Sequence, residues 1–375
     1  MKLLFALYKY FPWGGLQKDT LRFAEEAVRR GHQATILTTG WQGECPAGIE
    51  VRRCECHGWS NHARMVHFAE EFRRIKETCE FQATLAMNRI PGADFYFVAD
   101  SCMALWMPKK HSWLALHLLP RYRVYLRQEA EICAPDSPTR LMVIAPSQKR
   151  EYQQAYGLPD ERFVALPPGM DPRCGHPADA SARRLAKRRE LGLSDDELVC
   201  LEVGTNLWRK GVDRSMAAVV DQMTLGRKIR FLLVGGDGQD GVRSMAEQFG
   251  LCEIVQCLGP RADVPDLLLA ADVMVHPARE EGTGTVLIEA IAAGLPVICT
   301  AVCGFADYVA ASGGRVVPEP FKQTALNEAL ADCLERRAEL SRRALDYAAT
   351  QDFTGRSRAA IKAMEEGPAS RSETA

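Results

Sequence analysis

The sequence has little net charge, no long apolar run and no regular cysteine spacing. Its 375 residues include 47 Lys and Arg and 48 Asp and Glu, a formal charge of −1, which argues against a protein that wraps nucleic acid or carries a disordered acidic tail. The longest uncharged stretch, residues 290–306, is interrupted by glycine and proline and is shorter than the roughly 20 apolar residues that span a bilayer. The 13 cysteines are scattered and the N-terminal segment lacks a small-residue cleavage site, so we expect a reduced, cytoplasmic protein.

The charges that are present are unevenly distributed. Residues 1–166 contain 22 basic and 18 acidic side chains, whereas residues 167–375 contain 25 and 30. Residues 101–128 hold no acid and mix aromatic with basic side chains, among them Trp106, Lys109, Lys110, Trp113, Arg121, Arg123 and Arg127. This mixture suits contact with an anionic membrane surface, although a solvated basic face is the ordinary alternative. We expect Pro108 and Pro120 to divide the segment into short pieces.

Strand and helix patterns alternate in two separate parts of the chain. A strand at 2–8, a helix at 17–30 and a strand at 33–39 form one βαβ unit, and a second series begins with a strand at 198–203. The fold class is therefore α/β, with two Rossmann-like domains that we expect to face a central cleft. Paired prolines after Leu166 suit a hinge. We expect domains at 1–166 and 167–345, a helix at 346–366 that crosses back to the first domain, and a flexible tail at 367–375.

Three loops after predicted strands could bind an anionic ligand. The first contains Gly14 and Gly15 and leads into a helix that carries Asp19; glycines there allow close approach to the free N–H groups of a helix N-terminus, although an ordinary βα turn explains them equally well. The second contains Arg209 and Lys210, which together could hold a diphosphate. An isolated Arg-Lys pair more often indicates a solvated surface loop. The position of this pair after a strand and beside glycines instead favours binding of an anionic ligand.

The third loop is the most specific of the three. It contains Glu281 and Glu289, eight residues apart, on either side of a helix start. Carboxylates accept hydrogen bonds from sugar or ribose hydroxyls, and an acidic first turn alone would not explain Glu289 on an apolar helix. The backbone N–H groups of the helix start suit a phosphate or sugar and belong to Gly282, Thr283, Gly284, Thr285 and Val286.

Metal and dinucleotide chemistry have weaker support. A group of Cys and His residues lies between Cys54 and His67, but its spacing fits no standard zinc pattern. No paired D-x-D acids end a strand, so we expect no metal bridging a diphosphate and no cofactor. The G-x-G-x-x-G fingerprint of nicotinamide-dependent dehydrogenases is absent from the first loop.

In this order and across two Rossmann-like halves, the three loops resemble the GT-B retaining glycosyltransferases of family 4, which are marked by two glutamates with seven residues between them. Within that family, segments 7–17, 209–215 and 294–304 are similar to enzymes that add glucose to inner-core heptose of lipopolysaccharide. The resemblance implies a UDP-sugar-dependent, metal-independent hexosyltransferase that is peripheral on the cytoplasmic face of the inner membrane.

The resemblance also implies roles for individual residues. Glu289 would hold ribose hydroxyls, Glu281 donor-sugar hydroxyls, and Arg209 with Lys210 the diphosphate. Arg261 matches a nucleotide-binding position and Arg173 one near the phosphates, so these two arginines would join Arg209 and Lys210 at the diphosphate. Gly14, Gly15 and Asp19 would close over the donor. The residues implied in catalysis are Asp19, Arg209, Lys210 and Glu281.

Two alternatives stay open at this point. The loop at 282–285 carries two threonines, so a UDP-N-acetylhexosamine donor is possible besides UDP-glucose. The chain could also be a non-catalytic, membrane-associated protein that binds nucleotide sugars, although Arg209, Lys210, Glu281 and Glu289 favour an enzyme.

Overall fold

The computed structural model describes residues 1–12, 14–235 and 239–367, and its chain divides into two compact units. Unit 1 contains Met1–Gly169 and the chain from Gly355 onward, and unit 2 contains Met170–Thr354. The first unit thus ends after the two prolines, three residues later than expected. Gly169 packs against the side chain of Arg356, which ties the proline turn to unit 1.

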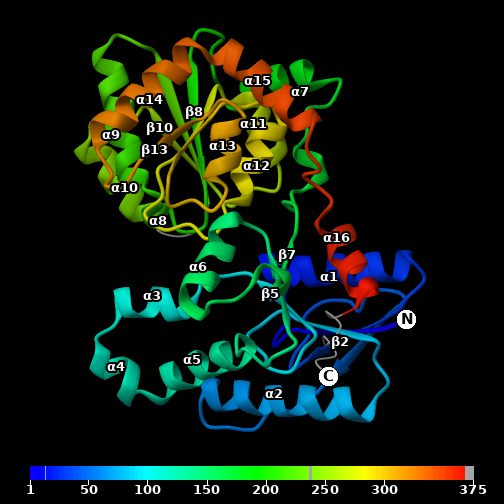
Figure 1. Cartoon of the computed structure of the whole chain (residues 1–375). Helices are drawn as coiled ribbons and strands as arrows, with labels where there is room; N and C mark the ends of the chain where they lie inside the picture. Colours follow the sequence, from blue (N-terminus) through cyan, green and yellow to red (C-terminus); the bar gives the residue numbers. More distant parts are fainter. Residues whose placement is uncertain (13, 236–238, 368–375) are drawn as a thin grey trace. The chain divides into compact units, whose positions relative to one another are not determined.

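Unit 1 is a seven-stranded parallel sheet in the order β3-β2-β1-β4-β5-β6-β7 (Figure 1). Its strands are β1 (Lys2–Ala6), β2 (Gln33–Thr38), β3 (Ile49–Arg53), β4 (Ala83–Ala86), β5 (Phe95–Val98), β6 (Arg140–Val143) and β7 (Phe163–Ala165). Its helices are α1 (Gly15–Arg29), α2 (Asn61–Thr78), α3 (Met103–Lys110), α4 (Trp113–Leu118), α5 (Pro120–Ile132), α6 (Pro146–Tyr156), the short η1 (Asp160–Arg162) and α16 (Arg356–Glu366).

Unit 2 is a six-stranded parallel sheet in the order β10-β9-β8-β11-β12-β13. Its strands are β8 (Leu198–Val203), β9 (Ile229–Val234), β10 (Val255–Gly259), β11 (Val273–His276), β12 (Val297–Thr300) and β13 (Arg315–Val317). Its helices are η2 (Pro172–Cys174), α7 (Ala180–Glu190), α8 (Leu207–Lys210), α9 (Val212–Thr224), α10 (Gln239–Gln248), α11 (Val264–Ala270), α12 (Thr285–Ala292), α13 (Ala306–Ala311), α14 (Gln323–Glu335) and α15 (Arg337–Ala349).

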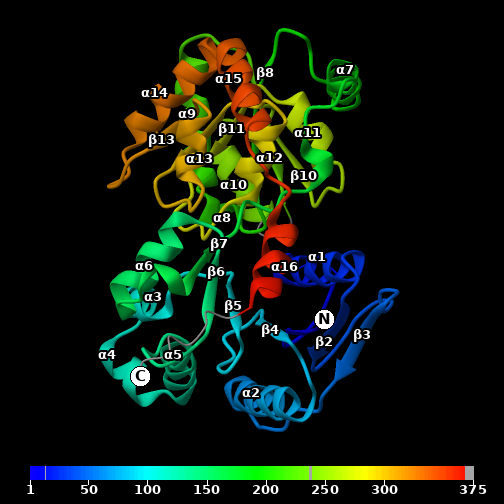
Figure 2. The same ribbon diagram turned by 45° about the vertical axis from the view of Figure 1, so that its right-hand side comes forward.

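The central strand of unit 1 is buried on both faces, which explains its continuous apolar sequence. Leu3 and Phe5 point to a core shared with α1 and α16, whereas Leu4 and Ala6 point to a core shared with α2, α5 and α6. Figure 2 shows α1 and α16 side by side on one face of this sheet. Two-sided burial makes the sheet a rigid support for the loops at its carboxyl edge.

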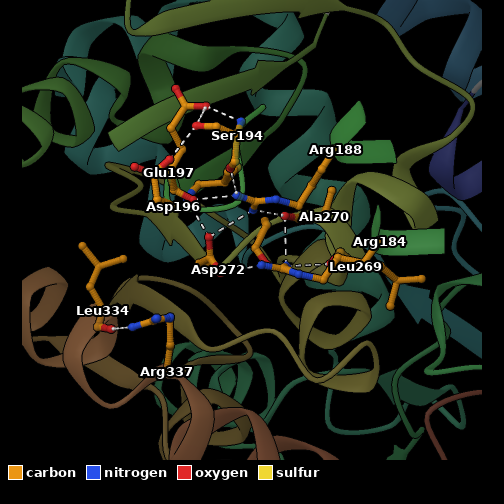
Figure 3. Close-up of polar contacts among 12 residues, drawn as sticks. Arg184, Arg188, Ser194, Asp196, Glu197, Leu269, Ala270, Asp272, Leu334 and Arg337 are labelled. Atoms are coloured by element: carbon orange, nitrogen blue, oxygen red, sulfur yellow. Dashed lines mark hydrogen bonds and ion pairs between the residues drawn. The ribbon is translucent and has the colours of Figure 1, made fainter. Parts of the chain in front are cut away.

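In unit 2, two arginines of α7 anchor that helix to the sheet (Figure 3). Arg184 donates to the carbonyls of residues 269–271, at distances between 2.6 and 3.0 Å, and to Asp272 at 2.7 Å. Arg188 donates to the carbonyls of Ser194 and Glu197, the latter at 2.6 Å. Because the last carbonyls of α11 have no partner within their own helix, the guanidinium of Arg184 satisfies them. Sequence reasoning missed this role.

The expected helix at 346–366 is wrong in its start and its continuity. Residues up to Ala349 belong to α15 in unit 2, and α16 begins only at Arg356, in unit 1. Between the two helices, the Asp352 carboxylate accepts a hydrogen bond from the Thr354 N–H at 3.3 Å and so supports a turn. Glu365 holds α16 to unit 1 through Arg30 and His32, at 2.5 and 2.6 Å. Of the expected tail, residues 368–375 lie outside the described residues.

The acid-free segment forms α3, α4 and the first part of α5, which Figure 1 shows as neighbouring helices at one side of unit 1. Pro120 begins α5 as expected, but Pro108 lies inside α3 and does not divide the segment. The division falls at His111 and Ser112, where the Ser112 hydroxyl accepts the Ala115 N–H and caps α4. In the part of the chain that the structure describes, no helix is both long and apolar enough to cross a membrane.

Candidate functional site

The strand order of unit 2 defines a binding position at its carboxyl edge. From β8 the chain moves outward to β9 and β10, and then returns to place β11 on the other side of β8. Loops that follow the two strands at such a reversal diverge, and ligands of open α/β sheets bind between them. Lys210 follows β8 and Glu281 follows β11, so the two predicted loops meet at this reversal.

Lys210 and Glu281 form an ion pair across the two loops. Both side chains are largely buried, with 8% and 12% of their surface exposed. Burial alone would raise the pKa of Glu281, but the hydrogen bond from His276 and the positive charge of Lys210 lower it to about 2. The site therefore contains a carboxylate that stays ionised at neutral pH beside an ammonium group, a combination able to bind a hydroxyl and a phosphate oxygen.

The loop after β8 is shaped by a cap and by a glycine. The Asn206 side chain accepts the Arg209 N–H at 2.9 Å and starts the short helix α8. Gly211 then takes a left-handed conformation with φ of 87°, and a Cβ at this position would overlap the carbonyl oxygen of Pro277 in the loop after β11. Only glycine allows the two loops to approach this closely, and this approach brings Lys210 to Glu281.

Arg209 differs from its neighbour in its surroundings. Its side chain is exposed and takes part in no ion pair among the described residues, although its carbonyl accepts the Arg279 N–H at 2.9 Å. Arg279 pairs with Asp213 at 2.7 Å and lies over the Trp208 ring at 4.8 Å from its centre. Sequence reasoning missed Arg279 and Asp213, because a surface pair so far apart in sequence leaves no local pattern.

The loop before α12 supplies backbone N–H groups at the start of a helix. Gly284 is left-handed with φ of 84°, and the Thr283 carbonyl accepts the Phe305 N–H at 3.0 Å. Helix α12 begins at Thr285. The first N–H groups of a helix have no partner within the helix, so Thr285 and Val286 add donors to those of Gly282, Thr283 and Gly284.

Glu289 and Glu281 have different partners in the structure. Glu289 Oε1 accepts the N–H of Asp171 at 3.3 Å, just before η2, and the Asp171 carboxylate pairs with Arg173 at 2.6 Å. The structure thus brings Glu289 together with Arg173, whereas Glu281 pairs with Lys210. This grouping could not be read from the sequence, where the two glutamates form one motif.

Arg261 follows β10, as expected, but it faces acids. Its guanidinium is 2.5 Å from Asp263 and 3.1 Å from Glu190, and hydrogen bonds from Arg261 and Lys187 hold the pKa of Asp263 well below its usual range despite partial burial. Of the four cations predicted to meet a diphosphate, Lys210, Arg173 and Arg261 are therefore held by carboxylates in this structure. A phosphate would have to compete with these partners.

The predicted residues of unit 1 lie at the start of α1. Gly14 caps this helix and Gly15 is its first residue, while Trp13 of the same loop lies outside the described residues. The Asp19 carboxylate pairs with Arg356 of α16 at 2.8 Å. Burial raises the pKa of Asp19, and the charges of Arg356 and Arg22 oppose that rise. Asp19 thus also joins the two helices that cover one face of the sheet.

The Cys and His residues between 54 and 67 do not gather into a ligand set. The rings of His57 and His67 lie 5.4 Å apart edge to face, and burial with the neighbouring Cys56 raises the pKa of Cys54 to about 12. A thiol must lose its proton to bind a metal. Within the described ranges, no three His, Cys, Asp or Glu side chains are grouped as a metal site would require.

Comparison with known proteins identifies the class. Residues 183–352 match the family described as "Glycosyl transferases group 1". The chain is 36% identical over 358 residues to the lipopolysaccharide glucosyltransferase WaaG of Escherichia coli K12, covering 94% of this chain and 96% of the relative. The chain therefore belongs to the group 1 glycosyltransferases.

Other relatives and solved structures agree with this class. The D-inositol 3-phosphate glycosyltransferase of Stackebrandtia nassauensis is 29% identical over 383 residues, covering 90% of this chain and 83% of the relative. The crystal structure of WaaG has a TM-score of 0.86 at 35% identity, covering 96% and 99% of the two chains. Sucrose-phosphate synthase of Thermosynechococcus elongatus, with a TM-score of 0.75 at 20% identity and coverage of 97% and 98%, shares the fold. The predicted GT-B architecture of two Rossmann-like domains is confirmed.

Proposed function

We propose that this glycosyltransferase transfers glucose from UDP-glucose to a heptose of the lipopolysaccharide inner core, with retention of the anomeric configuration and without a metal ion. One observation carries the proposal: Lys210 and Glu281 meet at the strand-order reversal of unit 2 in a chain that is 36% identical over nearly its whole length to a lipopolysaccharide glucosyltransferase. The strand-order reversal indicates where the donor binds, and the similarity to the lipopolysaccharide glucosyltransferase indicates which substrates are used.

Unit 2 would bind the donor. In this proposal Glu289 accepts hydrogen bonds from the ribose hydroxyls, Arg173 and Arg261 bind the nucleotide, and Glu281 accepts from glucose hydroxyls. Arg209 and Lys210 hold the diphosphate, together with the N–H groups of residues 282–286. Because Arg209 is exposed and Lys210 buried, the exposed guanidinium meets the diphosphate first and Lys210 then exchanges its carboxylate partner for a phosphate oxygen.

The chemical step would rely on position and charge. The acceptor hydroxyl attacks the anomeric carbon on the face that the phosphate leaves, and its proton passes to the departing phosphate oxygen. Lys210 and Arg209 stabilise the negative charge that develops on UDP, as preorganised donors do in other enzymes. Two cations beside the diphosphate supply the charge that a metal ion provides elsewhere.

The test is a transfer assay on truncated core lipopolysaccharide that ends in inner-core heptose, with UDP-glucose, UDP-galactose and UDP-N-acetylglucosamine offered separately. We expect a mass increase of one hexose with UDP-glucose, unchanged by a metal chelator, and an α-linked product by nuclear magnetic resonance. A mass increase of one N-acetylhexosamine would show that the donor is a UDP-N-acetylhexosamine and not UDP-glucose. Loss of transfer with the chelator would contradict metal independence. Binding of UDP-glucose without any transfer would instead identify a non-catalytic binding protein.

We also propose that residues 101–128 bind the anionic cytoplasmic surface of the inner membrane, where the lipid-linked acceptor is made. Trp113, Leu114 and Leu118 are 69%, 60% and 68% exposed. These apolar residues lie on α4. The neighbouring helices α3 and α5 carry basic side chains that are all exposed: Lys109, Lys110, Arg121, Arg123 and Arg127. Each basic residue near such a surface contributes about 1 kcal/mol, and the exposed aromatic and leucine side chains enter the interface.

Vesicle co-sedimentation tests this second proposal. A variant with Lys109, Lys110, Arg121 and Arg123 changed to Glu should lose binding to phosphatidylglycerol vesicles, and binding by the native chain should weaken as salt rises. The matched control reverses four exposed basic residues elsewhere, Arg53, Arg189, Arg342 and Lys362, and should bind as the native chain does. Equal binding by both variants would contradict the proposal.

A further inference from the structure

His276 is a buried titratable residue that the proposed reaction does not use. It is the last residue of β11, its surface is fully buried, and its backbone is paired with Cys299 of β12. The charged groups that act on its ring are Glu281 and Lys210. His276 therefore lies in the site at the strand-order reversal of unit 2, within hydrogen-bonding distance of the carboxylate that we assign to the donor sugar.

The protonation of His276 follows from its neighbours. Its Nε2 lies 3.2 Å from Glu281 Oε2, and because the lowered pKa of Glu281 makes this carboxylate an acceptor only, Nε2 must donate. The other ring nitrogen, Nδ1, is buried without a hydrogen-bond partner among the described residues, so it carries no proton. Burial also lowers the pKa of His276, although Glu281 opposes this effect. The ring is neutral and donates one hydrogen bond.

The two donors on Glu281 differ in what they can do. Lys210 and His276 both contact Oε2, while Oε1 accepts no hydrogen bond from the residues that the structure describes. Lys210 has a flexible side chain and is the group that the proposed mechanism sends to a phosphate oxygen. His276 is fixed in a strand, and its Nε2 has Glu281 as its only acceptor within the described part of the chain.

We propose that His276 is a positioning residue, which keeps Glu281 Oε2 in place when Lys210 turns to the diphosphate, so that Oε1 faces the donor sugar. This inference rests on the proposed use of a UDP-sugar. A carboxylate with no fixed donor would rotate or follow Lys210 toward the phosphate. The imidazole holds the carboxylate by a neutral hydrogen bond and exchanges no proton during the reaction.

Two variants test the inference, His276→Leu and His276→Gln. The Leu side chain removes the hydrogen-bond donor and still fills the buried space, whereas the Gln side-chain amide can place an N–H near the position of Nε2. Because hydrogen bonds to charged groups are among the stronger ones, we expect His276→Leu to lower kcat/KM for UDP-glucose by about ten- to a hundredfold. We expect His276→Gln to recover activity to within about threefold of the native enzyme.

Binding of UDP alone separates positioning from folding. UDP lacks the sugar that Glu281 would contact, so its Kd by calorimetry should change less than about twofold in both variants, whereas UDP-glucose should bind more weakly to His276→Leu. A native kcat/KM in His276→Leu overturns the inference. Loss of UDP binding in parallel with activity, or failure of Gln to rescue a folded Leu variant, also overturns it.

The pH profile gives the last readout. A neutral His276 predicts that the native enzyme and His276→Gln share the same dependence of kcat/KM on pH between pH 6 and 8. A limb that is present in the native profile and missing in His276→Gln would show proton exchange by His276 and overturn the positioning role. A native enzyme that transfers nothing from any UDP-sugar contradicts the proposed function itself, and the inference falls with it.

Discussion

The two basic regions of the molecule differ in what their cations face. In unit 2 the predicted phosphate ligands Lys210, Arg173 and Arg261 are each held by a carboxylate. In residues 101–128 the basic side chains are exposed and have no acid within the segment, and the nearest acidic partner that Arg127 contacts is Glu131, just beyond it, at 3.6 Å. In our two proposals, carboxylates of the same unit position the site cations for a discrete anion, whereas the segment presents its charge to an extended surface.

The test with the largest expected effect removes the cation from the most buried of these three site pairs, Lys210 and Glu281. Lys210→Ala should lower kcat by about a hundredfold or more, since loss of one preorganised donor costs about 2.7–4 kcal/mol of barrier. Lys228→Ala, an exposed lysine paired with Asp196, is the control and should keep native turnover. Steady-state kinetics on UDP-glucose measures both, and near-native turnover in Lys210→Ala would remove this residue from the mechanism.

A second test uses the pH dependence of stability. The pKa of Glu281 in the folded chain is about 2, below its usual value of 4.5, so the pair stabilises the fold at neutral pH and that stabilisation is lost as pH falls from about 4.5 toward 2. A pKa shift of this size corresponds to a contribution of about 3 kcal/mol to the free energy of unfolding. Urea unfolding should show that Glu281→Gln is less stable than the native chain at pH 7 and that the gap narrows below pH 4.5. A gap that is constant with pH would show that the carboxylate is not stabilised by its partners.

A third test asks whether the pairing depends on the backbone approach at Gly211. Gly211→Ala places a methyl group against the Pro277 carbonyl, whereas Gly226→Ala introduces the same left-handed strain, with φ of 76°, into open space. We expect the first to be less stable than the second by about 1–3 kcal/mol, the typical cost of overpacking, and to lower activity as well. Thermal unfolding and kinetics measure the two effects. Equal losses in both variants would show that loop contact does not determine the position of Lys210.

The smallest effect concerns one charge of the exposed segment. Lys109→Gln should weaken binding to anionic vesicles by about 1 kcal/mol, close to fivefold, and leave kcat for a soluble acceptor fragment unchanged. Vesicle titration against salt provides the measurement. A change in kcat without a change in vesicle binding would reverse the roles of the two basic regions.

Local patterns were sufficient to predict much of the fold. The strand at 198–203 has the predicted bounds, because it is a short apolar run in the interior of a parallel sheet and is buried on both faces. The predictions failed at the ends of helices. The expected C-terminal helix is interrupted between Ala349 and Arg356, where Asp352 supports a turn, and the acid-free segment is divided at the Ser112 cap and not at Pro108.

The candidate site was predictable as residues but not as contacts. Lys210 and Glu281 stand out because they follow apolar strands beside glycines, and Glu289 stands out because it lies on an otherwise apolar helix. That Lys210 pairs with Glu281 while Glu289 contacts the segment of Asp171 could not be read from spacing. His276 and Arg279 escaped notice, because a histidine at the end of an apolar strand and a partly buried arginine carry no sequence signal until their partners are known.

The sequence by itself determined the two alternating α/β halves, the loops that carry chemistry and the segment without acids, since these depend on local periodicity and composition. The tertiary structure decided which charges neutralise one another. Parallel strand order brings the loops after β8 and β11 together, and Gly211 lets them touch. Such pairing depends on contacts between residues some 70 positions apart, which only the folded sheet can set.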